Sequence, residues 1–201
     1  MQLRHPPDEF CDLSEIDGIR LNILYGTDQN FTRRPLPGYG AQGAWILRSG
    51  FTKLQQVAVQ AARQGLGLMV WDAYRPRRAT LAMVQWAQST GNSHLLQEGY
   101  IARRSRHNSG AAADLSLYDL SSGALLDMGT EWDCFTARSH TFNATGVALH
   151  NRLLLQRLMT DVDFVGYEKE WWHFEMHNAG QYALRDVPYG FDEAEEDSRI
   201  C

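Results

Sequence analysis

The sequence predicts an α+β fold in which a central antiparallel sheet is flanked by helices. Stretches that alternate apolar and polar residues stand among stretches with apolar residues at helical spacing, and the two kinds follow no regular βα repeat. No internal repeat or linker is visible, and a hydrophobic share of 44% is ample for one core. We therefore expect a single domain over 1–201, ending in a solvated acidic tail over 190–201.

Four segments are expected to form strands. Residues 18–25 alternate as a half-buried strand does, and 66–71 form the short apolar run of a buried strand. Residues 111–118 alternate again, which places Asp114 on the opposite face from Leu115. The aromatic, β-prone segment 164–177 is predicted as one further strand.

Three segments are expected to form helices. Segment 51–63 has Ser49 before it as a cap and Gly65 after it as a stop. Segment 77–90 offers Leu81, Val84 and Trp86 as core contacts. Segment 144–160 is predicted as a long amphipathic helix. Its expected apolar residues are Val147, Leu149, Leu153, Leu154, Leu158 and Met159. Glycine, proline and small polar residues predict loops over 30–44 and 119–143.

Composition excludes several classes of protein. A net charge of -5 with no basic run argues against nucleic-acid binding. No segment approaches the ~20 apolar residues of a membrane span. The cysteines Cys11, Cys134 and Cys201 are odd in number and widely spaced, which excludes a cysteine zinc site and disfavours a disulfide framework. No signal peptide is visible, so we expect a soluble cytoplasmic protein, or a periplasmic one if a leader has been removed. A homo-oligomer stays open.

The first motif that carries chemistry runs from Ser105 to Asp114, SRHNSGAAAD. His107 and Asp114 are seven residues apart, so they are not a pair on one helical face. The small residues between them, Gly110 among them, allow a tight turn after which both side chains converge on one metal ion. A solvated loop histidine and a strand-edge aspartate are the alternative.

The second motif is Glu170-Trp-Trp-His173. Positions three apart on a regular strand face opposite sides, so the strand must end, bulge or twist here if both side chains serve one site. A surface glutamate and a histidine packed among aromatic rings are the alternative. Together the two motifs supply three ligands, His107, Asp114 and His173, with Glu170 as a base, as a catalytic zinc site requires.

A third motif, Trp-Asp72-Ala-Tyr-Arg75-Pro, lies upstream. Pro76 disfavours helix at the preceding residue, so Arg75 is expected at a strand end or turn. A fixed arginine can stabilise an oxyanion beside a metal, and Asp72 can orient its guanidinium. A structural salt bridge is the alternative.

These residues resemble the zinc D-alanyl-D-alanine dipeptidases of the vancomycin-resistance type. The resemblance rests on the patterns SxHxxGxAxD, ExxH and DxYRP, with further stretches at 25–31, 126–133 and 151–155, and it spans about residues 15 to 187. It implies one Zn²⁺ per chain bound by His107, Asp114 and His173. It also implies Glu170 as general base and acid, and Arg75 as the group that stabilises the tetrahedral intermediate.

The resemblance also implies how a small dipeptide substrate is held. Asp133 and Tyr25 map near its free ammonium, and Ser105 maps near its carboxylate. Trp132 and Cys134 beside Asp133 depart from the family pattern, as does Asn108-Ser109 after the first histidine.

The implied activity is hydrolysis of D-alanyl-D-alanine to two D-alanines. A zinc D,D-carboxypeptidase or endopeptidase acting on peptidoglycan peptides is the nearest alternative, although the long loop 119–143 favours a closed pocket. A non-catalytic zinc-binding module is a second alternative, against which the presence of Glu170 and Arg75 argues. Glycopeptide resistance and nutrient recycling require the same chemistry, so both roles stay open.

Overall fold

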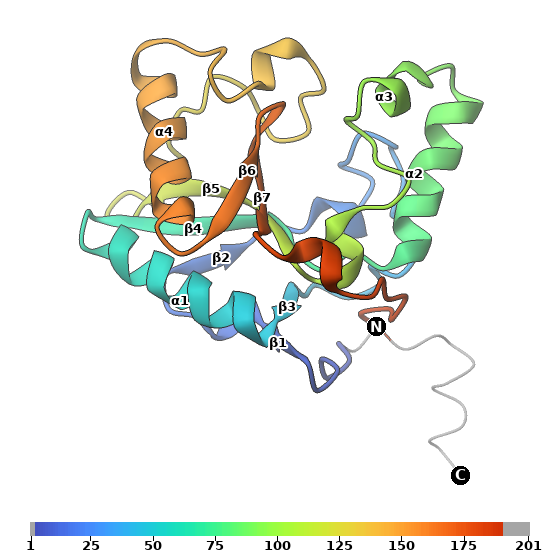
Figure 1. The fold of residues 1–201 in the computed structure, drawn as a ribbon, viewed down its shortest axis with the longest axis horizontal. Coiled ribbons are helices and arrows are strands. Elements are labelled where there is room, and N and C mark those ends of the chain that lie inside the picture. The colour runs from blue at the N-terminus through green and yellow to red at the C-terminus, as the bar shows by residue number, and fades with distance from the viewer. Residues whose placement is uncertain (1–2, 191–201) are drawn as a thin grey trace.

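A computed structural model describes residues 3–190 and shows helices around one five-stranded sheet (Figure 1). Beyond Gly190, which pairs with Leu3, the tail expected over 190–201 lies outside the described residues. None of the helices in the described part of the chain is long and apolar enough to cross a bilayer.

The sheet confirms the predicted fold class. Its strand order is β2-β4-β5-β7-β6, and every neighbouring pair is antiparallel except β2 and β4, which are parallel. A separate two-stranded sheet pairs β1 with β3. The strands are β1 (Phe10–Asp12), β2 (Ile19–Leu21), β3 (Trp45–Leu47), β4 (Leu66–Asp72), β5 (Ala112–Asp119), β6 (Phe164–Tyr167) and β7 (Glu170–Met176).

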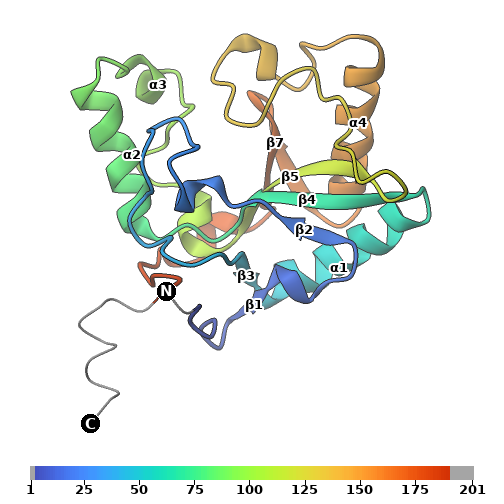
Figure 2. The ribbon, with the colours of Figure 1, turned by 180° about the vertical axis from the view of Figure 1, so that it is seen from behind.

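Four α-helices and five 3-10 turns are present within residues 3–190. The helices are α1 (Arg48–Ala62), α2 (Arg77–Ser89), α3 (His94–Gln97) and α4 (Gly146–Thr160). The 3-10 turns are η1 (Leu13–Glu15), η2 (Leu24–Gly26), η3 (Arg106–Ser109), η4 (Ala137–Ser139) and η5 (Ala179–Gln181). In Figures 1 and 2, α1 and α4 lie on one side of the molecule, whereas α2 and α3 lie at the opposite end.

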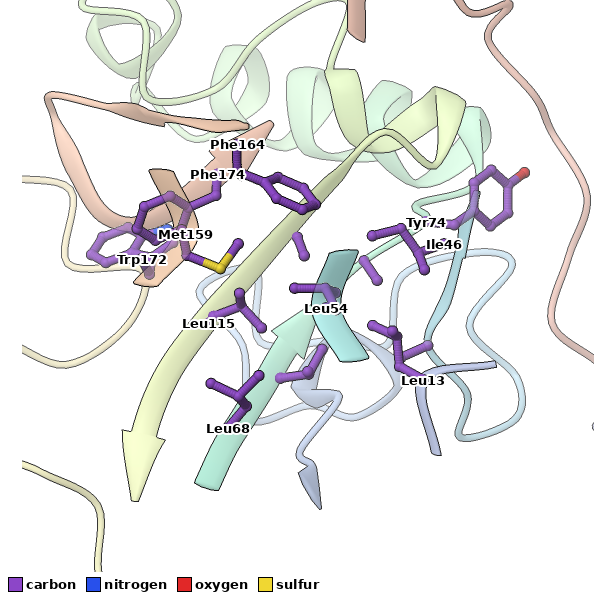
Figure 3. Packing of buried hydrophobic residues seen from close by; sticks show 14 of the residues in the cluster. Leu13, Ile46, Leu54, Leu68, Tyr74, Leu115, Met159, Phe164, Trp172 and Phe174 are labelled. Atoms are coloured by element: carbon purple, nitrogen blue, oxygen red, sulfur yellow. The ribbon is translucent and has the colours of Figure 1, made fainter. Parts of the chain in front are cut away.

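The core lies between the sheet and the helices α1 and α4. Alternate residues of the strands point to this side, so Leu68, Leu115 and Phe174 are buried together (Figure 3). Leu54 of α1 and Met159 of α4 close the cluster from the helical side. The other face of the same strands is thereby left to carry Asp114 and His173.

Two predicted strands differ from the observed ones. Segment 164–177 is a hairpin of β6 and β7 rather than one strand, and its turn is made by Glu168 and Lys169, which are not typical turn residues. The early strand is limited to Ile19–Leu21, so Tyr25 lies in η2.

The predicted helices are found at the expected positions in the sequence, but some of their expected caps and buried residues differ. Ser49 is not the cap of α1, which starts one residue earlier after Leu47 without a side-chain cap. Gly65 does adopt the left-handed conformation expected of a stop (φ 73°). On α2, Val84 is buried, whereas Leu81 is 51% exposed.

The buried face of α4 also differs from the prediction. Val147 and Leu153 are exposed, whereas the polar residues Asn151 and Arg152 are buried. Hydrophobic spacing misplaced this face because α4 packs against a polar loop as well as against the core.

Candidate metal centre and active-site cavity

Strand register aligns three of the predicted site residues in one row. Asp72 of β4 pairs with Asp114 of β5, and Asp114 pairs with His173 of β7. A register shift between Val70 and Asp72 lies just before the row. Residues far apart in the sequence thus meet near one end of the strands.

His107 reaches the row from η3, the turn that precedes β5. Ser105 caps η3 by accepting a hydrogen bond from the His107 amide (3.3 Å), and Asn108 completes a capping box. Gly110 ends η3 in the left-handed conformation (φ 72°), from which the chain enters β5. The small residues between His107 and Asp114 therefore make the turn that their pattern predicted.

The nitrogen and oxygen atoms of His107, Asp114 and His173 form a small triangle. His107 Nε2 lies 3.1 Å from Asp114 Oδ1 and 3.0 Å from His173 Nδ1, and His173 Nδ1 lies 3.1 Å from Asp114 Oδ1. His107 and Asp114 are each only 2% exposed. Within the described residues, these histidine and acidic side chains form a group that could hold a metal ion.

The contacts on the outer side of the two histidine rings are compatible with a bound metal ion. His107 Nδ1 donates to the Ala73 carbonyl (2.7 Å), which leaves the Nε2 lone pair of a neutral ring facing the triangle. His173 Nε2 points to Glu175 Oε2 at 4.0 Å, so its Nδ1 faces the triangle. Two imidazole nitrogens and one carboxylate oxygen then converge, a donor set that suits zinc.

Glu170 opens β7 directly after the hairpin turn. A register shift at Gly166/Tyr167 pairs Tyr167 with Glu170, which is the irregularity that the ExxH spacing required. Burial raises the pKa of Glu170 to about 8, against the opposing charge of His173. A carboxyl with such a pKa is suited to exchange protons near neutral pH.

Arg75 is fixed beside the triangle by Asp72. The Arg75 Nε and Nη2 atoms lie 2.9 and 2.8 Å from Asp72 Oδ2, and Nη2 lies 4.0 Å from Asp114 Oδ2. Tyr39 donates to the other oxygen of Asp72 (2.6 Å). The guanidinium also lies 5.1 Å from the centre of the Tyr25 ring. The orientation of the Arg75 guanidinium is therefore fixed by several contacts.

One carboxylate oxygen of Asp133 has no hydrogen-bond partner within residues 3–190. It adopts a left-handed conformation (φ 59°), and its Oδ1 accepts a hydrogen bond from the Tyr25 hydroxyl (3.1 Å). Its Oδ2 is buried and unpaired. Burial and then the charge of Asp114 raise the pKa of Asp133 well above its usual range. A cation entering from the cavity would satisfy this oxygen.

One cavity of about 500 Å³ collects nearly all the predicted site residues. Asp72 is the exception, because it lies fully buried behind Arg75. The predicted residues that line the cavity are Tyr25, Arg75, Ser105, His107, Asp114, Asp133, Glu170 and His173.

Sequence reasoning missed the supporting contacts of three residues, although it named Trp132 as a departure from the family pattern beside Asp133. Trp132 Nε1 lies 3.4 Å from Asp114 Oδ2, Tyr39 holds Asp72, and Glu175 faces the second nitrogen of His173. Only Glu175 had a usable signal, because it stands two residues after His173 on the same face of a strand. The other two come from loops whose path no periodicity predicts.

Two histidines, one aspartate and a buried glutamate that meet in a single cavity on a mixed sheet are typical of zinc metallopeptidases. Comparison with known proteins is consistent with this class. A family model described as D-ala-D-ala dipeptidase, of peptidase M15, matches residues 8–191. The chain belongs to this D-ala-D-ala dipeptidase family.

Individual relatives are similar over most of their length. The D-alanyl-D-alanine dipeptidase of Enterococcus faecium is 36% identical, over 90% of this chain and 93% of the relative. That of Escherichia coli (strain K12) is 32% identical, over 88% and 89% respectively. The solved structure of the LD-carboxypeptidase LdcB shares the fold (TM-score 0.51, 16% identity, 88% of this chain and 72% of that chain).

Proposed function

We propose that the protein hydrolyses the dipeptide D-alanyl-D-alanine with one zinc ion bound by His107, Asp114 and His173. Family membership supports the reaction. The observation that carries the proposal is the convergence of these three ligand atoms beside Glu170 and Arg75 in one cavity.

When bound, zinc supplies a Lewis acid that polarises the scissile carbonyl and lowers the pKa of a water molecule. Glu170 accepts the proton of the water that attacks the carbonyl carbon. Arg75, held by Asp72, donates to the oxyanion that develops on the former carbonyl oxygen. Glu170 then returns the proton to the leaving amine as the C–N bond breaks, which releases two amino acids.

Asp133 is proposed to bind the free ammonium of the substrate. Its buried, unpaired Oδ2 and the Tyr25 hydrogen bond to Oδ1 support this role. An acylated amine carries no charge and cannot form this ion pair, so a blocked peptide would leave the carboxylate without a partner. This favours a dipeptidase over the carboxypeptidase and endopeptidase alternatives. Ser105 lines the cavity, and its Oγ accepts a hydrogen bond from the His107 amide. Its hydroxyl proton is therefore available to donate to the substrate carboxylate.

Release of D-alanine by the zinc-loaded protein tests this function, with two variants that separate binding from catalysis. Glu170→Gln should retain zinc and lose about 10²–10⁴-fold in turnover, the typical contribution of a general base. His173→Ala should lose most of the zinc. Turnover near wild type in Glu170→Gln, or full zinc occupancy in His173→Ala, would remove that residue from its role.

A further inference from the structure

Arg152 is a buried cation on which the charge of Asp127 acts from beyond ion-pair distance. It lies on α4 and is 1% exposed, and within residues 3–190 no carboxylate lies at ion-pair distance from it. Its guanidinium instead donates to three backbone carbonyls, those of Met128 (2.7 Å), His140 (2.7 Å) and Arg138 (3.0 Å). Burying a charge is costly, so three well-placed bonds indicate a specific role.

The three carbonyls bracket one loop. Met128 stands at its start, and Arg138 and His140 stand at its end; we call residues 128–140 the amine loop. In Figure 1 it lies near the start of β7 and the N-terminal end of α4. The neighbouring residue Asn151 adds a bond to the Asp127 carbonyl (2.8 Å). One helix therefore holds both ends of the loop together.

The amine loop carries one residue that faces the proposed substrate amine and one that approaches the proposed metal ligands. Asp133 presents its unpaired oxygen, and Trp132 approaches Asp114. Apart from the 3-10 turn η4, the loop has no regular secondary structure to hold these side chains. Two further ties are Trp171 Nε1 to Thr130 Oγ1 (2.8 Å) and Ser139 Oγ to the Lys169 carbonyl (2.8 Å).

We propose that Arg152 is a positioning residue for recognition of the substrate amine: it fixes the amine loop so that Asp133 meets the free ammonium. This inference rests on the proposed function. Arginine is needed because three separate nitrogens reach three carbonyls, whereas lysine donates from a single nitrogen. Arg152 thus links α4 to substrate selection without touching the substrate.

The test compares Arg152→Lys with Leu155→Ala, a buried change on the same helix that makes none of these bonds. For each variant we would measure zinc content, kcat and KM on D-Ala-D-Ala, activity on N-acetyl-D-Ala-D-Ala, and amide hydrogen exchange of residues 129–137. Arg152→Lys should keep its zinc and raise KM at least tenfold with a smaller change in kcat. Its preference for the free dipeptide should fall, and exchange in the amine loop should quicken.

Leu155→Ala should lower the melting temperature but leave KM, the preference and the loop exchange unchanged. Unchanged KM and exchange in Arg152→Lys, or the same changes in both variants, would overturn the proposal. If Arg152→Lys does not fold, Asn151→Ala should show the same pattern more weakly, and its absence would count equally against the proposal. If the wild type does not hydrolyse D-Ala-D-Ala, the proposed function fails, while hydrogen exchange still decides whether Arg152 holds the loop.

Discussion

His107 and His173 both direct a nitrogen at Asp114 Oδ1, and without a metal a proton must hold this triangle together. Burial lowers the pKa of His173, but its hydrogen bond to Asp114 and the nearby Glu175 carboxylate outweigh this and raise the pKa to about 10. We therefore expect His173 to carry a proton at pH 7 in the metal-free protein. In the proposed function, a bound zinc ion would take the place of that proton.

Proton release on zinc binding tests this account of the triangle. At pH 7 we expect about two protons per zinc, one from His173 and one from Glu170, because a nearby dication favours the ionised carboxylate. The apparent zinc affinity should consequently rise with pH up to about 10, and more steeply below about 8, where Glu170 also loses a proton. Calorimetry in buffers of different ionisation enthalpy measures the count. Glu170→Gln should release about one proton fewer, and an equal count in both proteins would contradict the protonated state of Glu170.

The substitution Asp133→Asn should affect the stability and the activity of the protein in opposite directions. Asn tolerates the left-handed conformation (φ 59°), so Asp133→Asn removes the charge with little backbone cost. Loss of the buried ion pair with the substrate should lower kcat/KM on D-Ala-D-Ala. The expected loss of transition-state stabilisation is about 2–5 kcal/mol.

Stability should change in the other direction. A carboxyl whose folded-state pKa lies above its unfolded value destabilises the fold as pH rises through the unfolded value. At pH 7 the metal-free Asn variant should therefore unfold at an equal or higher denaturant concentration than the wild type. A less stable variant with full activity would indicate that Asp133 only supports its loop.

At the level of elements, the site depends on the junction between η3 and β5. Gly110 has a φ of 72°, and a Cβ there would overlap the ring of Phe10. Because Gly110 ends the turn that carries His107, its conformation sets the approach of His107 to Asp114. We therefore expect the proposed metal site to depend on the η3–β5 junction.

Gly110→Ala should destabilise the protein by more than the roughly 1–3 kcal/mol of a strained backbone, because Phe10 must also move. It should weaken zinc binding as well. Gly65→Ala is the matched control: Gly65 has a similar φ of 73° but no atom near its Cβ position, and it follows α1 away from the site. Chemical unfolding and zinc titration of both variants measure the difference. Equal losses of stability with unchanged zinc affinity would argue against this role of the junction.

At the scale of the whole molecule, the sequence predicted the fold class because β5, α1 and α2 have clear periodicity and β4 is a short apolar run. It could not predict the hairpin at 168–169, whose turn lacks typical turn residues, or the buried face of α4, where Arg152 serves a loop. Motif spacing selected His107 and His173 as candidates, but their meeting depends on the register of strands distant in the sequence. Supporting residues from loops, such as Trp132, had no local signal.

According to the proposed function, one cavity contains both a zinc site and a carboxylate, Asp133, that binds the free ammonium of the substrate. The most direct measurement compares kcat/KM of the zinc-loaded protein on D-Ala-D-Ala, N-acetyl-D-Ala-D-Ala and L-Ala-L-Ala. We predict rapid hydrolysis of the first and negligible hydrolysis of the acetylated peptide, because acetylation leaves the buried Asp133 oxygen without an ammonium. Comparable rates on the free and acetylated D,D-dipeptides would contradict the account and favour a carboxypeptidase.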